Sequence, residues 1–207
     1  MGPLNVVIVD DHVALRRGME LLLRRAGHHV VGTADDAEHA EALILRRRPD
    51  IALVDLGLPG RSGADLTRSL LQADPDLRIV LYTGAADERE LLEGLDAGAA
   101  GFALKSGDPA ELEQAILTVA AGDDYLDPRL TPLISRGANG GGQVLSPRER
   151  EILELLCQGL SGEEAAKRLF LSSETVRTHV RNAMSKLGAA TRVHAVALAL
   201  QRGEITA

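Results

Sequence analysis

The first 126 residues alternate short apolar runs with longer amphipathic stretches. The apolar runs are continuous rather than alternating, which is typical of strands buried on both faces of a parallel sheet. They predict strands at residues 6–9, 30–31, 51–54, 79–81 and 102–104. The amphipathic stretches predict helices at residues 14–26, 36–47, 63–72, 87–97 and 109–121. Five strands alternating with five helices imply a doubly wound α/β fold, (βα)5, with a five-stranded parallel sheet.

The pattern changes near Asp127. The glycine-rich stretch 136–143 predicts a flexible linker. Beyond it the chain is helical throughout, with two Ser-x-x-Glu capping boxes that mark helix beginnings. The predicted helices are 147–158, 162–169, 173–187 and 191–202, and the short turn between the second and third is typical of a helix-turn-helix. The expected organisation is an α/β domain, a linker and an all-α four-helix domain, at residues 1–126, 127–144 and 145–207.

Charge separates the two expected domains further. Residues 1–126 contain 12 basic and 22 acidic residues, whereas residues 145–207 contain nine and seven. An acidic domain suits cations or phosphoryl groups, and a mildly basic domain suits nucleic acid. No run of about 18 apolar residues and no basic, apolar leader is visible, so we expect neither a membrane span nor a secretory signal. The single cysteine, Cys157, is expected to be buried in a protein of the reducing cytoplasm.

Acidic residues stand where two of the predicted strands end. Asp10 and Asp11 follow the first strand, and Asp55 ends the third. If the strand order is 2-1-3-4-5, these two strands are neighbours and the three carboxylates meet at one edge of the sheet. Like charges at such distances repel unless a hard cation neutralises them, and Mg²⁺ with oxygen ligands is the natural candidate. A single aspartate after a strand is more often a solvated loop residue or a helix cap.

Two further polar residues end strands at the same edge. Thr83 ends the fourth strand and Lys105 ends the fifth. A hydroxyl, an ammonium, a metal and a carboxylate together make a phosphoryl-transfer site in which Asp55 attacks as the nucleophile. Taken separately, Lys105 would be a surface lysine and Thr83 an ordinary strand residue.

This set of residues resembles the receiver domain of bacterial two-component response regulators. The resemblance extends to about residue 121 and rests on Asp10-Asp11, Asp55-x3-Pro59-x3-Gly63, Thr83 and Lys105. It implies that Asp55 accepts a phosphoryl group from a sensor histidine kinase. It also implies Mg²⁺ bound by Asp11, Asp55 and the Gly57 carbonyl, with Asp10 assisting through water.

Two positions near the fifth strand bear on the switching expected of a receiver. Phe102 matches the family's switch aromatic, whose inward rotation accompanies movement of Thr83 toward the phosphoryl group. Ordinary core packing of Phe102 is an equal alternative. Ser106 stands where many receivers have a proline, often in a cis bond, so a cis peptide is not expected after Lys105.

The helix predicted at 173–187 has two distinct faces. Its inward face carries Val176, Val180, Ala183 and Leu187. Its outward side supplies the candidate DNA contacts, which are Thr175, Arg177, Thr178, His179, Arg181 and Lys186. Arginine pairs with guanine or with phosphate, and sequence does not decide between them. His179 has no cysteine or carboxylate partner at ligand spacing, which favours packing or a phosphate contact over metal binding. A solvated basic face on an ordinary helical bundle is the alternative.

Residues 145–207 resemble the output domain of the NarL/FixJ class, also called LuxR-type. The resemblance rests on LSPRERE at 145–151, GLS at 159–161, Ala165-Ala166, TVRTHV at 175–180 and KLG at 186–188. The chain departs from the family at Gly162-Glu163-Glu164, where Asn-Lys-Glu is common, so one basic backbone contact is in doubt.

The family's output domains dimerise through their last helix. One stripe of this helix carries Val193, Ala197 and Leu200, and another carries Ala195, Val196 and Ala199. One stripe can face the core while the other pairs with a second copy, and we assign the dimer contact to the first. A dimer reading two half-sites suits a small module of modest charge.

These inferences together predict a phosphorylation-gated, DNA-binding transcriptional regulator. Its expected partners are a sensor histidine kinase, promoter half-sites in double-stranded DNA, a second copy of itself and, as a further candidate, RNA polymerase. It would catalyse only its own phosphorylation and dephosphorylation.

Two alternatives stay open at this point. One is a metal-dependent phosphatase or hydrolase, disfavoured because the loop after Asp55 lacks a second acid and because no phosphate-binding glycine motif occurs. The other is a receiver regulated by protein contact without phosphorylation, disfavoured by the intact set of five site residues.

Overall fold

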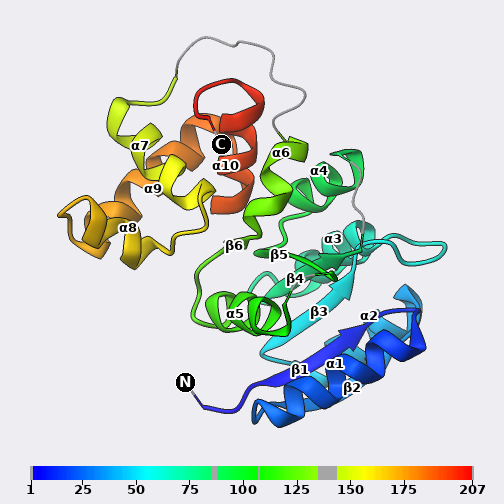
Figure 1. Ribbon diagram of the computed structural model, residues 1–207. Helices are drawn as coiled ribbons and strands as arrows, with labels where there is room; N and C mark the ends of the chain where they lie inside the picture. The colour runs from blue at the N-terminus through cyan, green and yellow to red at the C-terminus, as the bar shows by residue number, and fades with distance from the viewer. Residues whose placement is uncertain (1, 85–87, 107, 135–143, 207) are drawn as a thin grey trace. The chain divides into compact units, whose positions relative to one another are not determined.

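The computed structural model describes residues 2–84, 88–106, 108–134 and 144–206 (Figure 1). The chain divides into two compact units, Met1–Gly122 and Asp123–Ala207. The predicted linker is helical over part of its length, because Pro128–Leu130 form a 3-10 helix, η1, and Thr131–Ile134 form a short helix, α6. Leu130 and Ile134 are both buried. These two apolar residues stand four positions apart, so they lie on the same helical face and can be buried together. The prediction of a flexible coil was therefore wrong for residues 128–134. Residues 135–143 lie outside the described part of the chain.

A parallel sheet forms the centre of the first unit. Its main strands are β1 (Asn5–Val9), β2 (His29–Ala34), β3 (Ile51–Asp55), β4 (Ile79–Thr83) and β5 (Gly101–Leu104). The sheet order is β2-β1-β3-β4-β5-β6, where β6 is the two-residue strand Tyr125–Leu126. The predicted order of the first five strands is confirmed. The sixth strand was missed because two residues are too short to show a period.

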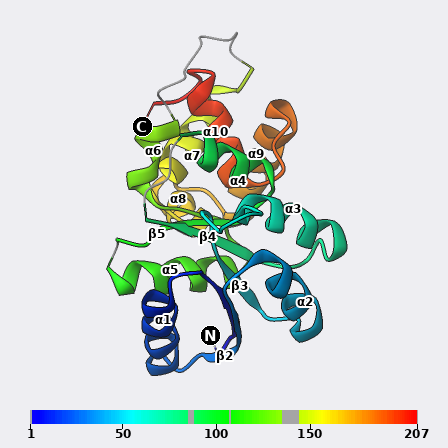
Figure 2. The ribbon, with the colours of Figure 1, turned by 90° about the vertical axis from the view of Figure 1, so that its right-hand side faces the viewer.

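Five helices alternate with these strands. They are α1 (Val13–Arg25), α2 (Ala37–Arg47), α3 (Gly63–Ala73), α4 (Glu88–Asp96) and α5 (Pro109–Ala120). The side chains of Asp36, Ser62 and Asp108 accept backbone N–H groups at the starts of α2, α3 and α5. Figure 2 shows α1 and α5 on one face of the sheet and α2 and α3 on the other. Every residue of β3 and β4 is buried, as the continuous apolar runs predicted.

The second unit is helical, as predicted for the C-terminal domain. After η1 and α6 come α7 (Pro147–Cys157), α8 (Gly162–Arg168), α9 (Ser173–Leu187) and α10 (Arg192–Gln201). Both predicted capping boxes form, with Ser146 starting α7 and Ser161 starting α8. The buried face of α9 is the predicted set Val176, Val180, Ala183 and Leu187. None of the helices in the described residues is both long enough and apolar enough to cross a membrane.

Candidate functional site

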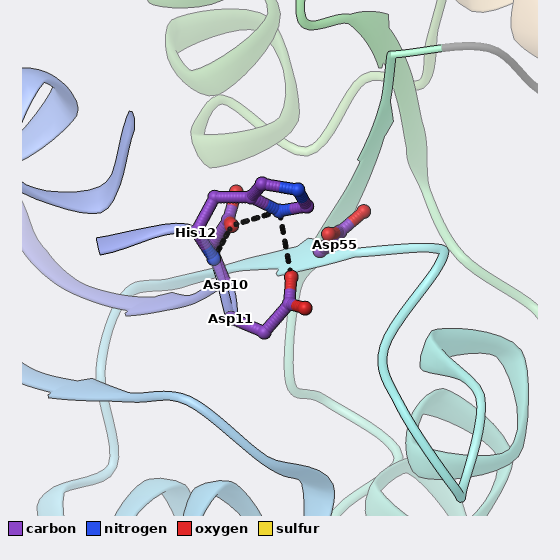
Figure 3. A group of neighbouring side chains, drawn as sticks. All are labelled: Asp10, Asp11, His12 and Asp55. Atoms are coloured by element: carbon purple, nitrogen blue, oxygen red, sulfur yellow. Dashed lines mark hydrogen bonds and ion pairs between the residues drawn. The ribbon is translucent and has the colours of Figure 1, made fainter. Parts of the chain in front are cut away.

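Three aspartates converge at the carboxyl end of the sheet in the first unit. Asp10 follows β1, and Asp55 is the last residue of the neighbouring strand β3. Asp10, Asp11, His12 and Asp55 each offer a ligand atom, and these atoms all lie within 4.8 Å of one another (Figure 3). Asp10 and Asp55 are buried, whereas Asp11 and His12 reach solvent. Adjacent parallel strands thus bring together acids that are more than 40 residues apart in the chain.

Lys105 joins two of these carboxylates. Its Nζ lies 2.5 Å from Oδ2 of Asp55 and 3.0 Å from Oδ2 of Asp10. Its backbone N–H donates to the carbonyl of Thr83 at 2.7 Å, which places the ends of β4 and β5 side by side. Because only 11% of the Lys105 side chain is exposed, its ammonium is a strong local counter-charge.

Asp10 is held by donors on both of its oxygens. Oδ1 accepts the backbone N–H of His12 at 2.7 Å, and Oδ2 accepts the hydroxyl of Tyr82. Burial alone would raise the pKa of Asp10, but the hydrogen bonds from Tyr82, Lys105 and the His12 amide hold that pKa below its ordinary value. Burial, and then Asp10 itself, raise the pKa of Tyr82 well above its ordinary value. Asp10 therefore stays ionised and Tyr82 stays a hydrogen-bond donor.

Tyr82 and His12 are two site residues that sequence reasoning missed. Each stands next to a residue that was identified, since Tyr82 precedes Thr83 and His12 follows Asp11. A tyrosine in an otherwise aliphatic strand, one position before a strand-end hydroxyl, was the available signal. No role for Tyr82 was predicted from the sequence.

The loop after β3 closes tightly beneath Asp55. The backbone N–H of Gly57 donates to Oδ1 of Asp55 at 3.1 Å, so the Gly57 backbone lies beside this carboxylate. A Cβ on Gly63, the first residue of α3, would lie 2.1 Å from the backbone oxygen of Asp55. Only glycine allows the helix to start this close to the strand.

The switch candidates occupy buried positions. Thr83 is 6% exposed at the end of β4, and Phe102 is 1% exposed on β5. A Cβ on Gly94 of α4 would come within 3.0 Å of the Phe102 ring, so this ring is packed into the core in the present structure. Among the described residues no peptide bond is cis, in agreement with the expectation from Ser106.

The acidic cluster has the chemistry of a hard-cation site. Its donors are carboxylate oxygens, which Mg²⁺ prefers. Oδ1 of Asp11 is buried and accepts no hydrogen bond, although Nδ1 of His12 lies 2.7 Å away as an ion-pair partner. The His12 side chain is 67% exposed, so its ring can turn toward solvent and leave this oxygen to a cation. The cluster therefore fits a divalent cation.

In the second unit, α9 presents a polar face opposite its buried one. Arg177 and Arg181 are exposed, while Thr175, Thr178 and His179 are half-buried. Arg177 pairs with Glu174 at 2.8 Å, but both side chains are about 70% exposed, so this pair costs little to break. The exposed face is therefore available to a ligand.

Lys186, a candidate DNA contact, has a partner within the fold. Its Nζ lies 2.7 Å from Oε2 of Glu149, which is 4% exposed. The same carboxylate oxygen accepts the backbone N–H of Ser146 at 2.7 Å and so closes the capping box of α7. Burial acts to raise the pKa of Glu149, but Lys186 and Ser146 hold it below its ordinary value. Lys186 thus ties the end of α9 to the start of α7.

Replacing Glu149 with glutamine should destabilise the second unit by about 1–3 kcal/mol at neutral pH, because Lys186 and the Ser146 amide lose a charged acceptor. The folded-state pKa is lowered, so the stabilisation is present above the carboxyl's ordinary pKa and is lost as the pH falls through the folded value. The difference from wild type should shrink below about pH 4. Amide hydrogen exchange of α7 at two pH values measures this. An equal difference at both would contradict the role of the charge.

The proposed dimer stripe is buried in the structure. Val193, Ala197 and Leu200 are each 3% exposed or less, and the alternative stripe of Ala195, Val196 and Ala199 is equally buried. Two residues just before η1 bind the start of α10. Oδ2 of Asp124 accepts the backbone N–H groups of Arg192 and Val193 at 2.5 and 3.2 Å, and Asp123 pairs with the Arg192 guanidinium at 2.5 Å. Neither stripe is free for a second copy in this arrangement.

Comparison with known proteins decides what these two units are. Residues 6–117 match the response regulator receiver domain family, and residues 143–199 match the LuxR family of bacterial regulatory proteins. The chain belongs to the response regulators of the NarL/FixJ class. The predicted receiver and helix-turn-helix domains are thereby confirmed, and this response regulator is a DNA-binding regulator of transcription rather than a classical enzyme.

Several relatives match the response regulator along its whole length. It is 34% identical over 212 residues to the oxygen regulatory protein NreC of Staphylococcus carnosus, covering 96% of this chain and 98% of NreC. It is 34% identical over 204 residues to the DNA-binding transcriptional activator DevR/DosR of Mycobacterium tuberculosis, covering 95% and 94%. A solved complex of the response regulator RcsB with DNA shares 26% identity and a TM-score of 0.60, covering 97% and 99%. Both domains therefore occur in the same order in its relatives.

Proposed function

We propose that Asp55 accepts a phosphoryl group from a sensor histidine kinase and that this modification controls DNA binding by α9. The observation that carries the proposal is the placement of Asp55, which is buried at the sheet edge with the Lys105 ammonium 2.5 Å from one of its oxygens. The other oxygen accepts the Gly57 amide. A carboxylate fixed in this way is oriented to attack a phosphorus atom that enters from solvent.

Residues of this chain supply most of the chemistry. An Asp55 oxygen forms the new bond to phosphorus as the bond to the kinase histidine breaks, and the released imidazole nitrogen keeps the electron pair and takes up a proton. Lys105 then binds a phosphoryl oxygen instead of the bare carboxylate. Thr83, at the end of the adjacent strand β4, would donate its hydroxyl to another phosphoryl oxygen.

A magnesium ion completes the proposed site. Asp11, Asp55 and the Gly57 carbonyl would hold it, with Asp10 assisting through water. When bound, Mg²⁺ neutralises the charge that accumulates on the transferring oxygens. The unbonded oxygen of Asp11 supports this assignment.

For the output domain we propose that α9 is the recognition helix and enters the major groove of DNA. Thr175, Arg177, Thr178, His179 and Arg181 supply its contacts. Because Lys186 is bound by Glu149, we assign its ammonium to the fold rather than to the groove. Glu163 is exposed at the start of α8, where its charge repels a phosphate and lowers the affinity of a single domain.

A dimer is the form that we propose for the DNA-bound state. Two RcsB dimers have been solved on parallel DNAs, and that protein is 25% identical to this chain with a TM-score of 0.61. Dimerisation through Val193, Ala197 and Leu200 requires that α10 become exposed, because all three side chains are buried here. Phosphorylation would supply that rearrangement in the cytoplasm, and RNA polymerase would be the further partner of the bound dimer.

Truncating Arg181 to alanine should weaken the binding of the full-length regulator to its selected promoter DNA. If the guanidinium pairs with guanine, the loss should be about 1–3 kcal/mol and confined to one base position. If it contacts phosphate, affinity should fall evenly across sequences and the salt dependence should flatten by about one unit. Fluorescence anisotropy at several salt concentrations measures both quantities.

The matched control is Arg89→Ala, which removes an arginine that is 86% exposed on α4 of the receiver. Its affinity for DNA should equal that of wild type. If Arg181→Ala also binds with unchanged affinity to every sequence, α9 does not enter the groove with this face.

A further inference from the structure

Tyr82 contacts the proposed phosphoryl-transfer site but takes no part in the proposed transfer of the phosphoryl group. It lies on β4 opposite Asp55 on β3, because the two residues are partners in the strand register. Its hydroxyl donates to Oδ2 of Asp10, and its ring centre lies 4.9 Å from Nζ of Lys105, within the range of a cation–π interaction. Tyr82 therefore touches both charged groups that flank the phosphoacceptor.

In the structure only protein groups solvate the carboxylate of Asp10, since Asp10 is 0% exposed. A buried carboxylate that loses a donor leaves a desolvated charge, and the remaining donors are drawn toward it. One of those donors is the backbone amide of His12, which the chain holds in place. Another is the ammonium of Lys105, which lies beside Oδ2 on a long, flexible side chain. Nδ1 of His12 lies 3.3 Å from Oδ1, not beside the Oδ2 that the Tyr82 hydroxyl would leave. Loss of the Tyr82 hydroxyl would consequently be compensated by movement of Lys105.

That movement would take Lys105 away from Asp55. The ammonium now lies 2.5 Å from Asp55 and 3.0 Å from Asp10, so it is shared and favours Asp55. We propose that Tyr82 is a positioning residue: by occupying Oδ2 of Asp10, its hydroxyl keeps the Lys105 ammonium on Asp55, where the phosphoryl group is received. This inference rests on the proposed function of Asp55.

The first test is Tyr82→Phe in the full-length regulator, which removes the hydroxyl and keeps the ring. With acetyl phosphate as donor and saturating Mg²⁺, the maximal rate constant of Asp55 phosphorylation should fall about 10- to 100-fold. The half-saturating concentration of acetyl phosphate should stay unchanged, because the hydroxyl does not touch the donor. A residue that only fills the core would leave the rate constant unchanged as well, and that result would overturn the proposal.

The matched control is Tyr125→Phe, which removes the hydroxyl of the only other tyrosine in the chain. Its rate constant should equal that of wild type. Asp10→Asn provides the second comparison, since a residue acting through Asp10 has nothing to act on in that background. Adding Tyr82→Phe to Asp10→Asn should cause no further loss. If the two losses multiply instead, Tyr82 acts elsewhere and the proposal is wrong.

A metal-free measurement tests the hydrogen bond itself without altering Tyr82. The chain has two tyrosines and no tryptophan, so the Tyr125→Phe variant emits through Tyr82 alone. A phenol that is hydrogen-bonded to a carboxylate fluoresces weakly, because its excited state transfers the hydroxyl proton to the carboxylate. Emission should therefore rise when Asp10→Asn is added to Tyr125→Phe. Unchanged emission would show that the hydroxyl does not lie on Asp10 and would overturn the proposal.

These outcomes are separable from failure of the proposed function. A wild-type regulator that takes up no phosphoryl group, or takes it up at a residue other than Asp55, contradicts the role of Asp55 and with it the role assigned to Tyr82. Phosphorylation of Asp55 with an unchanged rate in Tyr82→Phe contradicts only the Tyr82 inference.

Discussion

Replacement of Asp55 by asparagine should abolish phosphorylation of the regulator. The amide nitrogen and oxygen of asparagine are poor nucleophiles, and Asp55 is the only acidic residue of β3. Wild-type and variant protein are incubated with acetyl phosphate and Mg²⁺, and the mass of the intact protein is then measured by mass spectrometry. Wild type should acquire one phosphoryl group per chain, the Asn variant none, and chelation of the metal should suppress the wild-type reaction.

Asp65→Asn is a suitable control, because Asp65 lies in the same unit with its side chain 54% exposed and paired with Arg68 on α3. It should be phosphorylated like wild type. A phosphoryl adduct that persists in the Asp55→Asn variant would move the nucleophile to another residue. Equal DNA affinity of the phosphorylated and unphosphorylated wild-type regulator would instead favour control by protein contact alone.

Gly63→Ala should disrupt both the fold of the receiver and its chemistry. The added methyl group would lie 2.1 Å from the backbone oxygen of Asp55 and 2.9 Å from Cα of Leu56. Both contacts are with backbone atoms, which cannot change rotamer as a side chain can. The start of α3 and the end of β3 must therefore move apart. We expect a destabilisation of about 1–3 kcal/mol or more, together with slower phosphorylation, because Asp55 is displaced from Lys105. Thermal unfolding by circular dichroism measures the first effect and mass spectrometry the second.

Gly18→Ala is the matched control for this glycine substitution. A Cβ on Gly18, inside α1, would meet no atom within 4 Å. The change should stabilise the receiver by about 0.5–1 kcal/mol, because alanine favours the helical backbone. If Gly63→Ala is as stable as wild type, the tight start of α3 does not constrain Asp55.

The fold was predictable where burial is two-sided. The runs that became β3 and β4 are apolar at nearly every position, because each strand has neighbours on both edges and helices on both faces. The second strand was predicted as residues 30–31 but spans His29–Ala34. This strand lies at the edge of the sheet and is only partly buried, so polar residues and a glycine are tolerated along it. The hydrophobic pattern therefore does not reveal the full length of such an edge strand.

The site was predictable where chemistry follows topology. Asp10 and Asp55 stand at the ends of the neighbouring strands β1 and β3, so the order of the sheet places them together. Lys105 follows β5, beyond β4, and its long side chain reaches both carboxylates from there. Tyr82 could not be assigned in the same way, because a tyrosine inside a strand serves packing and hydrogen bonding alike. The ion pair of Lys186 with Glu149 could not be predicted either, because Glu149 lies 37 residues earlier in the chain. The Ser-x-x-Glu capping box already accounted for that glutamate.

The contacts of Asp123 and Asp124 with Arg192 change where a DNA-binding fragment of the regulator should begin. Homology to LuxR-type domains begins at residue 143, and the sequence alone placed the domain start at 145. A fragment that starts there would lack the acceptor for two amides at the beginning of α10 and the buried residues Leu130 and Ile134. Expression and crystallisation trials of the DNA-binding half should therefore begin at Asp123, and limited proteolysis of the intact chain should spare the peptide bonds between Asp123 and Ile134.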